Sequence, residues 1–174
     1  MAVLSVLHEP DKRLRKVSKP VDIITSDVIS FIQDMVDTMY DQEGIGLAAP
    51  QVNMHKRIIV LQAPTFLEDV RENLPLYKMI NPVIVQRSDE VCAIEEYCLS
   101  VPGEGVEIQR SYRITVEYID ENGAAQSLEA ENILSICIQH EIDHLDGKLI
   151  IDSLSPLKKK VALKRLTKRK QDEE

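Results

Sequence analysis

Residues 131–146 read ENILSICIQHEIDHLD, and the predicted fold is arranged around this segment. Its apolar residues recur at three- and four-residue steps, which is the period of an α-helix. Gly147 follows and predicts the end of that helix. Because its flanks are mostly apolar, we expect the helix to be buried against a sheet. The apolar positions are Ile133, Leu134, Cys137, Ile138 and Leu145.

The same helix carries the pattern HExxH, formed by His140, Glu141 and His144. Two imidazoles at i and i+4 lie on one helix face, separated by roughly 6 Å of axial rise, so their ring nitrogens can meet at one ion. Histidines also reach this spacing by chance on charged surface helices, but two of only 4 histidines in the chain lie here. The pattern therefore predicts two metal ligands and, in Glu141, a proton carrier.

Residues before this helix show both helical and strand patterns. Residues 26–44 repeat apolar side chains at helical spacing, with Ser26 or Asp27 as the predicted cap. Residues 57–62 and 76–86 are rich in Ile, Val and Leu, which is typical of strands. Prolines are expected where these strands start or stop, at Pro64, Pro75 and Pro82.

A hairpin is predicted directly before the HExxH helix. Residues 112–120 and 124–130 alternate apolar and polar side chains around Asn122-Gly123, a strong signal for a tight turn between antiparallel strands. Helices grouped with meandering strands indicate the α+β class. We therefore expect antiparallel sheets packed around a central HExxH helix, with a further helix at the C-terminus.

Length and composition limit the classes of protein that fit. The 174 residues favour a single domain, 1–174, since domains typically run to ~100–200 residues. No apolar run approaches the ~20 residues needed to span a bilayer, and the N-terminus lacks the pattern of a signal peptide. Three cysteines without a secretory signal indicate reduced thiols. We expect a cytoplasmic protein whose partners include neither a membrane nor DNA.

The C-terminal segment differs in charge from the rest of the chain. The net charge is -8, yet residues 158–170 contain eight Lys or Arg and no acidic residue. Ser155 as a cap and Pro156 in the first turn predict a basic helix over residues 156–170. Such a charged run is usually a solvated helix face.

A catalytic zinc-type site usually takes three protein ligands, so HExxH needs a third. Cys137 is on the same helix, but the rise from Cys137 to His144 is roughly 10 Å while metal–ligand bonds are ~2.0–2.3 Å, so one ion cannot join both ends. Cys137 is therefore expected to be a core residue. Spacing alone does not choose between Cys92 and Cys98.

Three segments together resemble the signature motifs of the peptide deformylases. They are GIGLAAPQ at residues 44–51, EYCLS at 96–100 and QHEIDHLDG at 139–147, in the order and at the separations usual in that family. The resemblance covers nearly the whole chain, and the helical tail resembles the type 1 bacterial members. Two departures stand out: Tyr97 replaces the usual Gly, and Gly105 stands where the family often has a substrate-binding Arg.

The resemblance implies a metal-dependent hydrolase that removes the N-formyl group from the N-terminal Met of newly made polypeptides. It assigns the metal to Cys98, His140 and His144, with Fe²⁺ expected and Zn²⁺, Ni²⁺ or Co²⁺ possible in preparations. Glu141 would act as general acid and base while a water activated at the metal attacks the formyl carbon. Gln51, through its side-chain amide, and Leu99, through its backbone N–H, would stabilise the oxyanion.

Further residues are expected around the substrate. Ile45 and Leu47, on either side of Gly46, suggest a short strand to which a peptide could add, although a turn after the preceding helix also explains Gly44 and Gly46. Ile136 and Cys137 are candidate pocket walls, and ordinary core packing explains them equally well. Arg110 is expected to pair with Glu96 and support the ligands, with a solvent-exposed Arg as the alternative. These residues are Ile45, Gly46, Ile136, Cys137, Glu96 and Arg110.

Other functions stay open at this point. HExxH alone also fits a metal-dependent amidase or peptidase of different specificity. Tyr97 and Gly105 would fit a catalytically weak relative that only binds peptides. The basic helix suggests docking onto ribosomal RNA, which would weaken steeply with salt because phosphate contacts carry it.

Overall fold

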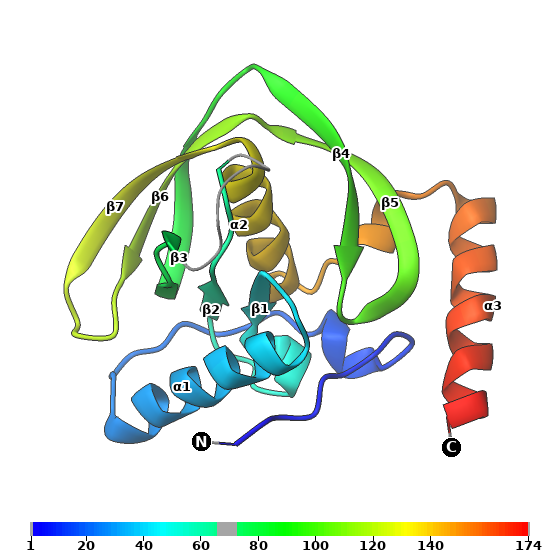
Figure 1. Ribbon diagram of the computed structural model, residues 1–174, viewed down its shortest axis with the longest axis horizontal. Helices are drawn as coiled ribbons and strands as arrows, with labels where there is room; N and C mark the ends of the chain where they lie inside the picture. The colour runs from blue at the N-terminus through cyan, green and yellow to red at the C-terminus, as the bar shows by residue number, and fades with distance from the viewer. Residues whose placement is uncertain (1, 66–72, 174) are drawn as a thin grey trace.

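A single buried helix lies at the centre of the molecule. The computed structural model describes residues 2–65 and 73–173. In it, helix α2 (Asn132–Leu145) runs between two groups of strands, with helix α1 (Ser26–Asp41) beneath it and helix α3 (Pro156–Glu173) along one side (Figure 1). Eleven residues of α2 are buried, on all of its faces. The expected burial of this helix against a sheet is confirmed.

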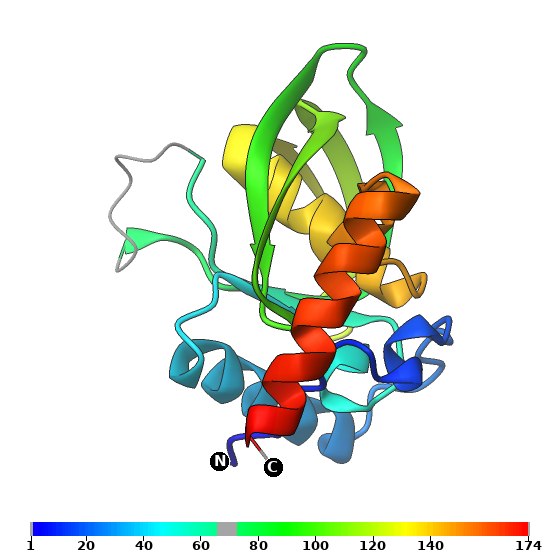
Figure 2. The ribbon, with the colours of Figure 1, turned by 90° about the vertical axis from the view of Figure 1, so that its right-hand side faces the viewer.

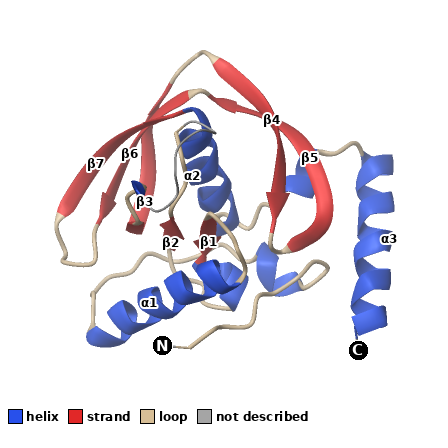
Figure 3. Ribbon diagram, viewed as in Figure 1, coloured by secondary structure: helices blue, strands red, loops and turns tan. Residues whose placement is uncertain are grey.

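Two antiparallel sheets surround α2, as the secondary-structure colouring makes clear (Figure 3). The larger sheet has the strand order β1-β2-β3-β6-β7, and the smaller one pairs β4 with β5. The α+β class is therefore confirmed. The strands are β1 Gly46–Ala48, β2 Ile58–Leu61, β3 Tyr77–Arg87, β4 Val91–Cys98, β5 Val101–Ser111, β6 Arg113–Ile119 and β7 Ala125–Glu131.

The predicted strands are found, with one correction. β2 falls within residues 57–62, and β3 covers the predicted 76–86 from Tyr77 and ends one residue later, at Arg87. β6 and β7 form the hairpin with Gly123 at a φ of 82°. Pro82, however, lies inside β3 rather than at its end. The strand shifts register between Ile80 and Val83, and Asn81 has a φ of 52°, so the proline occupies a bulge where the ladder needs no N–H from it.

The predicted helices are also found, and one cap differs. Thr25, not Ser26 or Asp27, is the N-cap of α1, because its side chain accepts the backbone N–H of Val28 at 3.4 Å. Gly147 follows α2 with a φ of 71°, as a C-terminal glycine should. α3 extends from Pro156 to Glu173, three residues beyond the expected end. Short 3-10 helices η1 (Lys12–Arg15), η2 (Ala49–Val52) and η4 (Ile150–Ser153) complete the helical elements used below.

β4 and β5 were not predicted from alternation. Their exposed positions include acidic residues, and Gly103 and Gly105 interrupt the apolar pattern of β5. Buried side chains of these two strands, among them Cys98 and Val101, instead belong to a core that also contains residues of the C-terminal elements. Ala162 and Leu166 pack there from α3, which crosses the β5 side of the molecule in Figure 2. None of the helices described is long and apolar enough to cross a membrane.

Candidate active site

One pocket gathers residues from all three sequence motifs. It has a volume of about 640 Å³ and is open to solvent. Its wall is built from the segment before β1, the end of β4, the start of β5, and α2. The structure places nearly all the predicted site residues on this wall. They are Ile45, Gly46, Gln51, Glu96, Cys98, Leu99, Ile136, Cys137, His140 and Glu141.

Cys98, His140 and His144 form a buried cluster, and the first two of them line this pocket. Their ligand atoms all lie within 4.8 Å of one another, and Cys98 Sγ is 3.2 Å from His144 Nε2. In a tetrahedral site with bonds of ~2.0–2.3 Å, neighbouring ligand atoms lie about 3.5 Å apart. One thiolate and two imidazoles at these separations fit a single divalent ion. Cys98 comes from the end of β4 and both histidines from α2.

The surroundings of the histidines suit ligation. Burial lowers the pKa of His144 well below its usual value, so its ring is neutral and keeps a lone pair. Burial also lowers the pKa of His140, but hydrogen bonds to Cys98 and Glu96 outweigh it and raise that pKa. The negative groups around His140 therefore favour a positive charge at this place. The same field favours a metal cation.

Arg110 and Glu96 pair beneath the cluster, as predicted. Arg110 donates from Nε to Glu96 Oε1 at 2.5 Å and from Nη1 to Asp143 Oδ2 at 2.7 Å. Burial raises the pKa of Glu96, but hydrogen bonds from His140 and Arg110 outweigh it, so the carboxylate stays ionised. His140 Nδ1, 2.8 Å from Glu96 Oε2, therefore carries the proton and donates it, leaving Nε2 as a ligand atom.

Glu141 is a carboxyl group on the wall of the pocket. It is buried, and burial raises its pKa to about 7. Its Oε2 atom has no hydrogen-bond partner among the residues that the structure describes. Gly46 of β1 lies against this carboxyl group so closely that a Cβ there would collide with Oε1 and approach Cys137 Sγ to 3.0 Å. A buried carboxyl with a pKa near neutral pH suits general acid and base catalysis.

Gln51 and Leu99 approach the cluster from the other side. Gln51 Oε1 accepts the backbone N–H of Ala48 at 2.8 Å, which fixes the orientation of the amide. Its Nε2 then faces Ser100 Oγ at 3.1 Å and Cys98 Sγ at 3.8 Å. Leu99 lies in the two-residue turn that joins β4 to β5. Both proposed oxyanion donors therefore line the pocket next to the metal cluster.

Two functional neighbours were missed by sequence reasoning. Ser100 holds the Gln51 amide, and Asp143 is the second carboxylate on Arg110. Both residues belong to the sequence motifs, but the spacing of residues within those motifs did not predict their contacts. Cys137 belongs to the core cluster beneath the larger sheet, as expected, and Cys92 contacts the backbone oxygen of Arg110.

The unusual Tyr97 does not obstruct the cluster. Its side chain is 65% exposed, whereas that of Cys98 next to it is buried, because neighbours on a strand point to opposite faces. Its hydroxyl donates to Glu95 Oε2 at 3.0 Å. Tyr97 therefore lies at the pocket mouth.

This fold and this site define a metal-dependent hydrolase: a buried Cys-His-His cluster, a buried carboxyl group beside it, and an open pocket above. Residues 3–160 match the family model described as polypeptide deformylase. A peptide deformylase of Buchnera aphidicola is 48% identical over 170 residues, 98% of each chain. Two solved structures agree. The peptide deformylase of Ehrlichia chaffeensis has a TM-score of 0.92 at 40% identity, covering 99% of both chains. The peptide deformylase of Legionella pneumophila has a TM-score of 0.89 at 40% identity, covering 99% of this chain and 98% of the other.

The chain belongs to the peptide deformylase family. The fold class expected from the pattern of helices and strands and the enzyme class expected from the resemblance are both confirmed. The family is metal-dependent, and the Cys98, His140 and His144 cluster is a possible site for the ion.

Gly46→Ala is expected to displace the Glu141 carboxyl group because the two cannot occupy the same space. We predict a fall in kcat of about 10- to 100-fold, since a displacement of ~1 Å in a catalytic group costs up to that much. Steady-state kinetics of formate release measure it, with circular dichroism to check folding. In a Glu141→Ala background the same glycine substitution should add little further loss. Equal losses in both backgrounds would contradict the proposed contact.

Proposed function

We propose that this chain removes the formyl group from N-terminal Met through one divalent ion held by Cys98, His140 and His144, with Glu141 as general acid and base. The observation that carries the assignment is the convergence of Cys98, His140 and Glu141 on the wall of one pocket, with His144 Nε2 3.2 Å from Cys98 Sγ. Deformylation is the activity of the family to which the chain belongs. The residue roles are our proposal.

A bound ion would act as a Lewis acid that polarises the formyl carbonyl and lowers the pKa of water towards ~7. Glu141 takes a proton from the attacking water and returns it to the leaving nitrogen. The pKa of Glu141, about 7, allows both directions near neutral pH. Gln51 Nε2 and the Leu99 backbone N–H would donate to the oxyanion that forms on the former carbonyl oxygen.

Substrate contacts follow from the pocket wall. Ile136 and Cys137, from α2, would receive the Met side chain. Gly46 begins β1, an edge strand of the larger sheet, and Ile45 precedes it, so an extended peptide could add there by backbone hydrogen bonds. Glu96 and Arg110 would not touch the peptide. Instead they hold His140 in the tautomer that ligation requires.

Three further assignments accompany this proposal: the ion, the cellular compartment and the extent of the domain. The ion in the cell would be Fe²⁺, since a thiolate and two imidazoles accept several divalent metals and the resemblance implies iron. The protein would work in the cytoplasm, where its substrates are made and where Cys92, Cys98 and Cys137 stay reduced. Residues 1–174 would act as one catalytic domain, because α2 packs against both sheets.

Glu141→Ala should reduce formate release from a short formyl-Met peptide by about 10²- to 10⁴-fold, because the variant keeps all three ligands but lacks the proton carrier. The assay is anaerobic, with Fe²⁺ supplied and metal content measured in parallel. The control is Glu117→Ala, which removes an exposed carboxylate from β6. Turnover surviving Glu141→Ala would refute the mechanism, and binding without turnover in the unsubstituted protein would favour the weak peptide-binding alternative.

Exposure to air is expected to lower the activity of the iron form, because oxidation of the iron or of the Cys98 thiolate destroys the cluster. The measurement compares formate release and free-thiol content for the Fe²⁺ and Zn²⁺ forms, prepared with and without oxygen. The Zn²⁺ form should change less. Equal activity in all four preparations would argue against iron.

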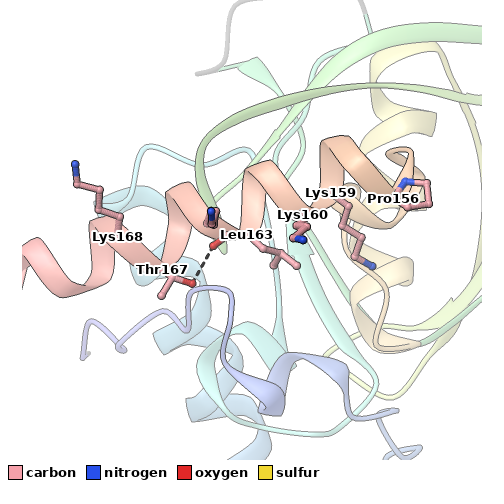
Figure 4. Close-up of a pocket in the computed structure, with 7 residues that line it drawn as sticks. Pro156, Lys159, Lys160, Leu163, Thr167 and Lys168 are labelled. Carbon is pink, nitrogen blue, oxygen red and sulfur yellow. Dashed lines mark hydrogen bonds between the residues drawn. The ribbon is translucent and has the colours of Figure 1, made fainter.

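The basic face of α3 is a proposed contact with ribosomal RNA. Lys160, Lys164 and Lys168 follow one another at four-residue steps along α3 and line one open surface pocket together with Lys159. Figure 4 labels Lys159, Lys160 and Lys168 around this pocket. The opposite side of α3 packs on the body through Ala162 and Leu166. A helix anchored by one face and cationic on the other can reach phosphates without unfolding.

Replacing Lys160, Lys164 and Lys168 by Gln should reduce co-sedimentation with ribosomes at low salt, because phosphate contacts are lost. The slope of log K for binding against log salt concentration should also become less steep, by up to ~0.7–0.9 for each lost phosphate contact. Exposed lysines of the N-terminal arm provide the matched control. Unchanged sedimentation of the α3 variant, or an equal loss in the control, would refute docking through α3. The control replaces Lys12, Lys16 and Lys19 by Gln.

A further inference from the structure

Residues 7–9, here called the arm, contact both segments that carry the proposed oxyanion donors. The backbone N–H of Leu7 donates to the carbonyl oxygen of Gln51 at 2.7 Å. Two residues later, the backbone N–H of Glu9 donates to the carbonyl oxygen of Ser100 at 2.8 Å. Because two bonds from one short segment limit the distance between their acceptors, the arm links Gln51 to the turn between β4 and β5.

Both acceptors lie next to an oxyanion donor. Ser100 directly follows Leu99, whose backbone N–H is one proposed donor, and the Ser100 hydroxyl lies 3.1 Å from Gln51 Nε2, the other. The Leu7 side chain is buried in the same core cluster as Cys98. Catalytic groups must keep their positions to within about 0.5 Å. A shift of the arm would therefore displace both donors relative to the metal ligands.

Glu9 is the buried charge that fixes the arm. Its side chain is 8% exposed, and Arg15 Nη2 donates to its Oε1 atom at 2.8 Å. Among the residues that the structure describes, Arg15 is the only cation paired with Glu9, and Glu9 Oε2 has no hydrogen-bond partner. A buried carboxylate that loses its cation is strongly destabilised. Without Arg15, the Glu9 side chain would move towards water and take the arm with it.

Arg15 is itself held by contacts with three other elements. Its Nη1 donates to Asp152 Oδ2 of η4 at 2.5 Å, and Lys159 of α3 pairs with the other oxygen of the same carboxylate. After the end of α2, a Cβ at Gly147 would lie 2.5 Å from the Arg15 backbone oxygen, so the two segments pack there without a gap. Arg15 therefore holds the arm against the end of α2 and against η4.

We propose that Arg15 is a positioning residue for deformylation, which acts through Glu9 and the arm on the two oxyanion donors. The inference rests on the proposed function of the pocket. Arg15 is not among the residues that line that pocket, so we expect it to touch neither the substrate nor the reacting atoms. Oxyanion donors act mainly in the transition state, so their displacement should lower kcat and leave KM nearly unchanged.

Arg15→Gln tests this proposal in an anaerobic assay of formate release from a formyl-Met peptide, with Fe²⁺ supplied and metal content measured. We expect kcat to fall about 5- to 30-fold, which is less than the ~10²–10³-fold loss caused by removing a whole oxyanion donor. KM should change by less than about twofold. Asp152→Asn is a second, milder variant, because it loosens Arg15 but leaves the bond to Glu9. It should fold and show a smaller fall in kcat at unchanged KM.

Gln51→Ala supplies the background for a double-mutant cycle. Arg15→Gln should cost at most about threefold in kcat in that background, because residues that act as a unit are not additive. Equal losses in both backgrounds would contradict positioning. Hydrogen exchange gives a readout besides activity: the backbone amide of Glu9 should exchange faster in Arg15→Gln, while the amides of β6 should not.

Arg113→Gln is the matched control, because it removes an arginine from an ion pair with Glu131 and lies outside this pocket. Its kcat and KM should equal those of the unsubstituted protein. Unchanged kcat in Arg15→Gln, or in Asp152→Asn if the first variant does not fold, would overturn the inference while leaving deformylation intact. So would a fall in kcat that matches an equal loss of bound metal. Absence of formate with the unsubstituted protein would instead refute the proposed function.

Discussion

Burial of one arginine constrains the active site and the elements that build it. Arg110 is 9% exposed and pairs with Glu96 and Asp143, while Glu96 also accepts from His140. A buried charge that loses its partner costs ~3–5 kcal/mol, so these groups must stay together. Because Arg110 comes from β5, Glu96 from β4 and His140 from α2, the ion pairs fix both strands against the helix. The same contacts therefore also hold the His140 ring in position.

The other polar residues of α2 follow the same rule. Gln139 and Ser135 are buried and donate to the backbone oxygen of Ser111, and Gln139 also accepts from Arg87. Each such bond ties α2 to the end of a strand. A helix buried on all faces can carry two histidines and a glutamate only because the surrounding sheets satisfy its remaining polar groups. The site is thus stabilised by the parts of α2 that do no chemistry.

Close packing also sets the position of the Glu141 carboxyl group. Gly46 contacts Glu141 where no side chain fits, and Gly105 leaves room for Glu95 at the mouth. Both glycines act through the space that they leave, not through conformational freedom. They couple β1 to the chemistry and β5 to the pocket rim. In α3, one face packs on the core and the other remains cationic, so catalysis and any docking use different surfaces.

The sequence by itself determined the central helix, the hairpin before it, α1, the basic helix and the two histidines, because each depends on local periodicity or on turn residues. It excluded Cys137 as a ligand through helix length alone. It did not choose between Cys92 and Cys98 without the family resemblance, and it did not predict β4, β5 or the roles of Ser100 and Asp143. Those depend on contacts between segments far apart in the chain. Only the tertiary structure brings the end of β4 to within 3.2 Å of His144, because the folding of both sheets onto α2 sets that distance and local sequence does not.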